Sequence, residues 1–187
     1  MSTQSNRRRR VAGIMLMPVA ALVIGACAPK PAPPPPAPPP PPPTVSCTVG
    51  GTLSDAVEQC HLKYKAYSLD TANVSAQDKA DSLIDMTPSQ CSSSLGAFHT
   101  PGSTLIAQYP GSSAVAENLQ CQYFSNGNCS GATFGATTAM NKWLASAGHK
   151  ANLDNFAGKS VNAAAACRSV ANGGTGVYIA VAQFHSP

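Results

Sequence analysis

The sequence predicts an α+β domain, and three features of the chain support this expectation. Two helical stretches come first, from about Leu53 to Ser68 and from Ala76 to Met86, and a third helix carries the only tryptophan, Trp143. Asn172-Gly173-Gly174 is then a hairpin turn signal between two β-like segments. Helices followed by a hairpin are typical of α+β architecture.

The first 26 residues are expected to be a lipoprotein signal peptide and not part of the fold. Arg7 to Arg10 form a basic region, and the apolar run from Val11 to Ile24 is shorter than the about 20 residues that a membrane span needs. Ile24-Gly25-Ala26-Cys27 matches a lipobox, so Cys27 should be acylated and begin the mature chain. The alternative is an uncleaved anchor helix.

Residues 27–46 are expected to form a lipidated N-terminus and a proline-rich linker. From 29 to 43 only Lys30, Ala32 and Ala37 interrupt the prolines, which favours polyproline II over helix or sheet. At ~3.1 Å per residue the tract would span roughly 45 Å. It would hold the folded domain, residues 47–187, away from a membrane, outside the cytoplasm on an outer membrane or at the cell surface.

The charge of the chain argues against nucleic-acid binding. The formal net charge is +4, but Arg7 to Arg10 account for it. The rest of the chain has eight Lys and Arg against eight Asp and Glu, so it lacks the excess of basic residues that is typical of nucleic-acid-binding proteins.

Cysteine usage is consistent with export. Apart from Cys27, six cysteines can form up to three disulfides, among fifteen possible pairings, and no Cys-x-x-Cys pair indicates a zinc site. The first expected pair is Cys121 with Cys129, which are close in sequence, and the sequence leaves the other pairings open. The six are Cys47, Cys60, Cys91, Cys121, Cys129 and Cys167.

The two N-terminal helices have recognisable beginnings. Thr52, with Asp55 three residues later, is a candidate N-cap for the helix over 53–68. Ser75 is a candidate N-cap for the helix over 76–86, which Pro88 limits at its C-terminal end.

His61 in the first helix is expected on the surface of that helix. Residues 89–116, rich in serine and glycine, are expected to be a long loop.

The helix around Trp143 is predicted to present His149 at its end. Met140, Trp143 and Leu144 form one apolar face of this helix, which follows Ser130-Gly131. Ala147-Gly148 indicates that the helix ends there. His149 would then lie at a helix C-terminus, where a positive charge is favoured. After it, Ser160 to Val170 and Gly176 to Phe184 are expected to be strands, with His185 as a terminal residue.

Three segments in order resemble motifs of one family. Trp143 to Leu153 resembles the signature Trp-x-x-Ser-x-Gly-His-Arg-x-Asn-Ile/Leu, Ala116 to Leu119 its Ala/Gly-Glu-Asn-Ile/Leu motif, and Val177 to Phe184 its closing strand ending in Gln-x-Phe. These are motifs of bacterial CAP-superfamily (SCP-like) domains, relatives of cysteine-rich secretory proteins, antigen 5 and pathogenesis-related proteins. The resemblance implies an α-β-α sandwich with a central antiparallel sheet.

The resemblance also implies a cleft that gathers two histidines and acidic residues. His99 and His149 match the histidines and Glu117 the motif acid, with Ser146 and Asn118 beside them in the cleft. These groups could hold a divalent metal such as zinc, act as general acid and base, or form a structural hydrogen-bonded network. Ser146 stands where many eukaryotic members have a second glutamate, and the first-helix Asn-x-x-Arg motif is missing.

The function expected from these residues is binding. The expected cleft has few acidic residues, and no nucleophile-elbow motif surrounds Ser146. Both features favour a non-enzymatic, membrane-anchored module that binds a lipid, a polymer or a protein partner. The alternative is a metal-dependent hydrolase acting on peptide or cell-wall material, so enzymatic activity is left open, as is a bound metal.

Overall fold

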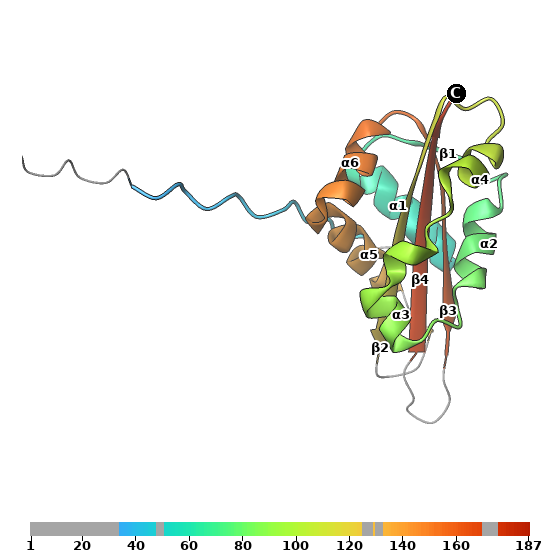
Figure 1. The fold of residues 1–187 in the computed structure, drawn as a ribbon, viewed down its shortest axis with the longest axis horizontal. Helices are drawn as coiled ribbons and strands as arrows, with labels where there is room; N and C mark the ends of the chain where they lie inside the picture. Colours follow the sequence, from blue (N-terminus) through green and yellow to red (C-terminus); the bar gives the residue numbers. More distant parts are fainter. Residues whose placement is uncertain (1–33, 48–50, 125–128, 130–132, 170–175) are drawn as a thin grey trace, which may run out of the picture. The chain divides into compact units, whose positions relative to one another are not determined.

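A computed structural model describes residues 34–47, 51–124, 129, 133–169 and 176–187. Residues 34–39 are exposed and form neither helix nor strand, and Pro40–Pro187 forms one compact unit (Figure 1). The expected signal peptide and the lipidation site Cys27 lie outside the described residues. Within the described residues, no helix combines the length and apolar character needed to cross a membrane.

The described part of the chain contains six α-helices, one 3-10 helix and four strands. The helices are α1 (Leu53–Tyr64), α2 (Ser75–Ser82), α3 (Pro88–Ser93), η1 (Leu95–Phe98), α4 (Gly102–Ala107), α5 (Thr133–Ala145) and α6 (Ala147–Asn155). The strands are β1 (Ser68–Leu69), β2 (Ala114–Phe124), β3 (Ser160–Arg168) and β4 (Gly176–Ser186). This composition confirms the expected α+β class and both C-terminal strands.

The four strands form one mixed sheet with the order β1-β3-β4-β2. β4 pairs antiparallel with both β2 and β3, whereas the short β1 runs parallel to β3. β2 and β1 are therefore the edge strands of the described sheet. The expected turn at 172–174 lies outside the described residues, between the antiparallel partners β3 and β4.

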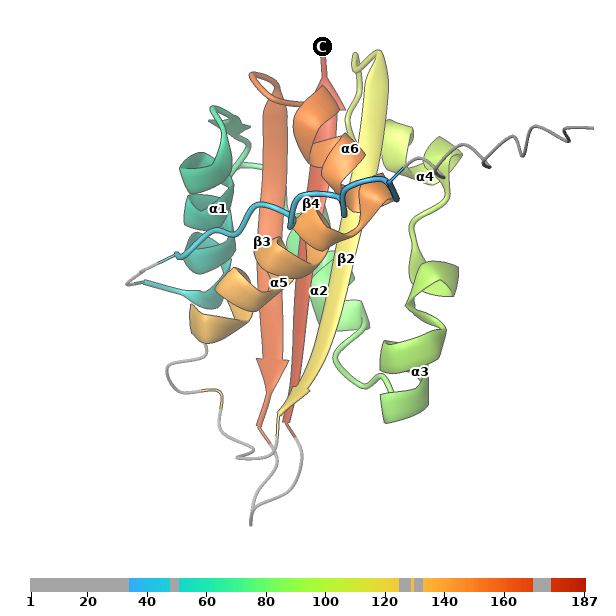
Figure 2. The same cartoon turned by 90° about the vertical axis from the view of Figure 1, so that its left-hand side faces the viewer.

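Helices cover both faces of the sheet (Figures 1 and 2). Buried residues of α1, α5 and α6 pack with Val161, Tyr178 and Phe184 in one core cluster. Buried residues of α2 pack with Leu119 and Ile179 in a second cluster on the opposite face. Since side chains alternate along a strand, β3 and β4 contribute to both cores and are buried along almost their whole length.

The first helix begins where the sequence predicts. The Thr52 hydroxyl accepts from the Asp55 backbone N–H, and the Asp55 carboxylate accepts from the Thr52 N–H, which is a capping box. The helix ends at Tyr64, short of the expected Ser68, because Ser68 and Leu69 pair with β3 as β1.

The second helix is shorter than predicted and is capped differently. Ser75 is its first helical residue, and the side chain of Asn73 accepts a hydrogen bond from the Ser75 N–H at 2.9 Å. The helix ends at Ser82 and not at Met86.

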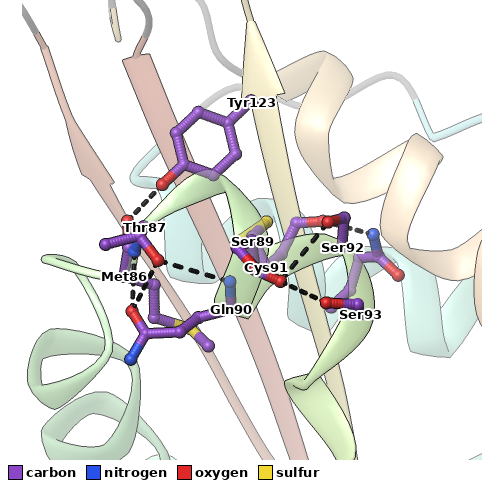
Figure 3. Close-up of a disulfide and its surroundings, with 10 residues drawn as sticks. Met86, Thr87, Ser89, Gln90, Cys91, Ser92, Ser93 and Tyr123 are labelled. Carbon is purple, nitrogen blue, oxygen red and sulfur yellow. Dashed lines mark hydrogen bonds between the residues drawn. A yellow bond between two sulfur atoms is a disulfide. The ribbon is translucent and has the colours of Figure 1, made fainter.

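The expectation of a long loop at 89–116 is wrong. This stretch contains most of α3, all of η1 and α4, and the start of β2. Thr87 and Gln90 form a capping box around Pro88, which begins α3 (Figure 3). Cys91 of α3 is also bonded to Cys121 of β2, and the Tyr123 hydroxyl donates to the Met86 carbonyl. Short helices of this kind are stabilised by such tertiary links more than by their own propensity.

The structure contains three disulfides, as the cysteine count predicts. They join Cys47 to Cys60, Cys91 to Cys121 and Cys129 to Cys167, with Cα atoms 5.3, 5.4 and 5.8 Å apart. The expected Cys121–Cys129 pair is wrong. Cys121 lies inside β2 and faces α3, whereas Cys129 is bonded to Cys167 in β3.

His61 is not a surface residue as expected. Its side chain is fully buried in the core, with rings of Tyr67, Trp143 and Phe184 at centroid distances of 5.6 to 5.7 Å. Its Nδ1 lies 2.8 Å from the Val57 carbonyl. Burial, opposed only by this hydrogen bond, lowers the pKa of His61 to about 4, so the ring is neutral in the folded protein at pH 7.

The chain is attached to the folded unit just before its first helix. The side-chain amide of Asn141 in α5 accepts from the Val45 N–H at 2.7 Å and donates to the Val45 carbonyl at 3.0 Å. The Cys47 N–H donates to the Thr137 hydroxyl, one turn earlier on α5. The last residues of the expected linker 27–46 therefore contact α5.

Candidate functional site

The candidate site is built on the edge strand β2, where Glu117 and Asn118 are adjacent. Neighbouring residues of a strand point to opposite faces of the sheet. Leu119 lies on the same face of β2 as Glu117 and packs in the second core cluster, which contains α2. Glu117 therefore points to the α2 side of the sheet, and Asn118 points to the side of α5 and α6. Both side chains are buried, and each holds a different histidine-bearing segment.

The Glu117 carboxylate accepts four hydrogen bonds. Its Oε1 receives the Thr100 backbone N–H at 2.8 Å and His99 Nδ1 at 3.2 Å, and its Oε2 receives the Thr100 hydroxyl at 2.8 Å and Gln183 Nε2 at 2.9 Å. Burial alone would raise the pKa of Glu117, but these donors outweigh it and lower the pKa to about 2. The group is therefore an anion at neutral pH.

His99 follows η1 and is oriented by Glu117. A carboxylate only accepts hydrogen bonds, so His99 Nδ1 carries a proton and donates it toward Oε1. When the ring is neutral, Nε2 is then the nitrogen with the free lone pair. The side chain is 34% exposed, which leaves part of the ring open to a ligand.

His149 lies at the beginning of a helix, not at the end as expected. The Trp143 helix α5 stops at Ala145, Ser146 occupies the N-cap position, and the Ser146 carbonyl accepts from the Lys150 N–H as α6 begins. Gly148 is thus inside α6 and is no helix stop. A helix N-terminus disfavours a cation, so the expected support for a protonated His149 is absent.

The surroundings of His149 favour its neutral form. Burial lowers the pKa of His149, and the charge of His99 lowers it further. The backbone of His149 is fixed by Asn118, whose Nδ2 donates to the His149 carbonyl at 3.1 Å. Asn118 Oδ1 in turn accepts from Asn152 Nδ2 at 2.8 Å, so the Asn118 side chain alone bonds to α6 at two points.

The two imidazoles meet beside the edge of β2. The ring centroids of His99 and His149 are 6.0 Å apart, with an angle of 41° between the planes. The structure therefore brings together His99, Glu117 and His149 through the contacts Glu117–His99 and His99–His149. Ser146 is half-buried at the start of α6 and makes no capping hydrogen bond with its side chain.

The predicted metal site does not fit as a three-ligand site. Both Glu117 oxygens are already bonded to protein donors, so binding a metal would require breaking these bonds. In the part of the chain that the structure describes, no three His, Cys, Asp or Glu side chains are arranged to hold a metal ion. His99 and His149 can supply two nitrogen ligands at most.

The sequence missed Gln183 and Thr100 as partners of the site. Gln183 pairs with Glu117 across β2 and β4, is fully buried, and accepts through Oε1 from the hydroxyls of Ser75 and Tyr109, both at 2.7 Å. A glutamine within an otherwise apolar strand was a signal for such a role. Thr100 carries no comparable signal, because its contacts depend on the turn after His99.

No protein-family model, no curated protein and no solved structure matches the chain.

Proposed function

We propose that the chain is a CAP-superfamily (SCP-like) domain of α-β-α sandwich type whose histidine cleft binds a ligand without chemical turnover. The ligand would be a lipid, a cell-wall polymer or a protein partner. The proposal rests on the three motif resemblances together with the geometry around Glu117.

The observation that carries the binding proposal is the state of the Glu117 carboxylate. A general acid or base needs a pKa near the working pH and access to the reacting proton. Glu117 has a pKa of about 2 and all of its hydrogen bonds come from the protein, so it orients His99 and does not exchange protons with a substrate. The two imidazoles remain as the polar groups that a ligand can meet.

Binding and turnover predict different results with defined probes. Sedimentation with an insoluble cell-wall polymer and with phospholipid vesicles should detect binding by the wild type that His99→Asn/His149→Asn loses. Asp78→Asn, on the exposed side of α2, is the control that should bind normally. All three proteins carry Cys27→Ala, so that a lipid anchor does not bind them to the vesicles. Equal binding by the double variant would contradict the role of the two histidines, and no binding by the wild type to either probe would contradict a lipid or polymer ligand.

The alternative, a metal-dependent hydrolase, is tested with the same variants. The binding proposal predicts no product from peptide or cell-wall substrates, whether or not zinc is added. Zinc-dependent product formation that disappears in His149→Asn would establish the hydrolase instead. Calorimetry with zinc chloride on the wild type and on His149→Asn measures whether the imidazoles bind the ion at all.

The proposed location is the outer membrane or the cell surface, through a lipid on Cys27. The lipobox, the basic region before it and the proline-rich residues after it support this proposal. Disulfides persist in oxidising compartments, and the three bridges are consistent with it. Mass spectrometry should find an acylated N-terminal Cys27 in the wild type and an unprocessed chain in Cys27→Ala, whereas a soluble, unprocessed wild type would end the proposal.

A further inference from the structure

A cavity lies at the opposite edge of the sheet from the histidine site. It has a volume of about 130 Å³ and opens between α1 and α2, along the outer edge of β3. For comparison, an engineered cavity of roughly 150 Å³ accommodates benzene, a ligand of six heavy atoms. Its lining residues are Ser54, Glu58, Thr71, Asn73, Val74, Gln77, Asn162, Ala163 and Ala164.

The cavity exists because the edge of β3 is only partly covered. β1 pairs with β3 at Ser160 and Val161, and the last bond of this ladder runs from the Asp70 N–H to the Val161 carbonyl. Further along, the Ala165 N–H donates to the Ser54 hydroxyl of α1, and the Ala165 carbonyl accepts from Gln77 of α2. Ala163 lies between these two covered positions.

The peptide groups of Ala163 face this gap. In an antiparallel pair, alternate residues direct both N–H and C=O away from the partner strand. The bonds of Val161 and Ala165 to β1, α1 and α2 show that the odd-numbered residues of β3 direct theirs to the outer edge. No described residue bonds to the Ala163 N–H or C=O there, so the cavity offers one backbone donor and one backbone acceptor.

Glu58 supplies a negative charge to the same cavity. It lies one helical turn after Ser54 on α1 and is half-buried, and among the described residues no donor or cation bonds to its carboxylate. Burial, and secondly the charge of Asp55, raise the pKa of Glu58, as expected for a carboxylate that lacks a cation. Glu58 and Glu117 are the only two glutamates in the chain, and the Glu117 carboxylate, unlike that of Glu58, accepts four hydrogen bonds.

Apart from Thr71, for which the described residues offer no hydrogen-bond partner, the remaining polar side chains of the cavity are already bonded within the protein. Gln77 bonds to Ser54, Asp81 and Ala165. Asn162 bonds to Asp70, Asn73 and Ala76. These bonds fix the walls, so a ligand meets a preformed site whose open groups are the Glu58 carboxylate, the Ala163 peptide groups and, at the exposed rim, the Thr71 hydroxyl.

The geometry points to a binding site for a small organic ammonium compound that also carries a hydrogen-bond acceptor. The ammonium group donates to the Glu58 carboxylate and the Ala163 carbonyl, and the acceptor of the ligand receives the Ala163 N–H. The volume limits the enclosed part of the ligand to about six heavy atoms. This site is independent of the histidine cleft and of the function proposed for it.

Ethanolamine and ethylene glycol form a matched pair of probes, because only the first carries an ammonium group. In a ¹H–¹⁵N NMR titration of the full-length chain at pH 7, ethanolamine should shift the Ala163 amide signal saturably, with a Kd in the millimolar range expected for so few atoms. Ethylene glycol should not. A cavity that holds only water predicts no saturable shift with either probe, and that result up to about 100 mM would overturn the proposal.

Two variants test the assignment of the residues. Glu58→Gln keeps the shape of the side chain but removes its charge, and should weaken ethanolamine binding at least about tenfold. Val74→Trp places a bulky group on an exposed lining residue and should also weaken binding, without touching the core. Asp78→Asn, which removes a charge from exposed α2 surface, should leave the Kd unchanged. An unchanged Kd in Glu58→Gln, or an equal loss in Asp78→Asn, would show that the cavity does not recognise the ammonium group.

Discussion

The rings of His99 and His149 lie 6.0 Å apart, held by two adjacent residues of one strand. Glu117 bonds to the His99 side chain, and Asn118 bonds to the His149 backbone. Since their side chains leave β2 on opposite faces, the edge of this strand fixes the separation of the two rings. A change in the segment that carries one of these histidines should therefore alter the environment of the other imidazole.

This coupling predicts the titration of His149. Replacing His99 with Asn removes the neighbouring charge, so the pKa of His149 should rise, yet stay below 6.5 because burial is the larger cause of its shift. NMR titration of the His149 ring measures both effects. A His149 pKa that is unaltered in His99→Asn would show that the two rings do not interact.

The two glutamates should respond in opposite ways to neutralisation. Glu117→Gln leaves buried donors facing an amide NH₂ and should lower the free energy of unfolding by about 3 kcal/mol. Glu58→Gln, at a carboxylate without a partner among the described residues, should change it by no more than about 0.5 kcal/mol. Urea denaturation at pH 7 measures both, and equal losses would contradict the hydrogen-bond pattern around Glu117.

The same pattern gives Glu117 a defined pH dependence. Its pKa is lowered from 4.5 to about 2, so its contribution to stability is fully present above about pH 4.5. That contribution should be lost as the pH falls toward 2. Glu117→Gln should therefore show a weaker loss of stability over this interval than the wild type.

His61 should make the fold sensitive to mild acid. Its pKa is about 4 when folded and 6.5 when unfolded, so the unfolded chain binds the proton more readily between these values. The free energy of unfolding should fall by about 3 kcal/mol from pH 6.5 to pH 4 on this account alone. Denaturation at several pH values should show a flatter dependence for His61→Leu, and identical slopes for the two proteins would be the contrary result.

Two glycines within helices should differ in their tolerance of alanine. A Cβ at Gly135 in α5 would lie 2.6 Å from Cζ of Tyr178, whereas a Cβ at Gly148 in α6 would meet no heavy atom within 4 Å. Gly135→Ala should therefore destabilise by about 1–3 kcal/mol through overpacking. Gly148→Ala should stabilise by about 0.5–1 kcal/mol through the lower entropy of the unfolded chain. Thermal unfolding of both variants checks the opposite signs.

The Cys91–Cys121 bridge should carry much of the stability of α3. Replacing both cysteines with Ala removes a cross-link over 30 positions and should cost about 3 kcal/mol. Hydrogen exchange should rise first in α3, a six-residue helix with no buried residue. Unchanged exchange in α3 would mean that the capping box and the Tyr123–Met86 hydrogen bond suffice without the bridge.

Local signals explain which parts of the fold the sequence could predict. The capping box at Thr52, the apolar face around Trp143 and the two C-terminal strands depend on neighbouring residues, and all three appear in the structure. α3 and the Cys129–Cys167 bridge depend on contacts with distant strands, so sequence spacing could not reveal them.

The candidate site shows the same division. Residues of one motif, such as Glu117 and Asn118, could be identified together, but their division between two faces of β2 follows only from the alternation of a strand. Gly148 was misleading because glycine is common after a helix, whereas here α5 and α6 are separated by Ser146 alone and the glycine lies inside the second helix. His61 was misleading because Gln59 and Lys63 lie two positions before and after it in the helix, whereas the aromatic rings that bury it come from outside that helix.

In mechanical terms, the Cys47–Cys60 bridge decides where tension on the proline-rich segment enters the domain. A pull on that segment first loads the hydrogen bonds between Val45 and Asn141, and then reaches Cys47. From there the covalent bridge passes the force directly to Cys60, which is packed in the core. The part of α1 before Cys60 is therefore bypassed while the bridge is intact, and the pull acts on the domain at Cys60 and not at the start of its first helix.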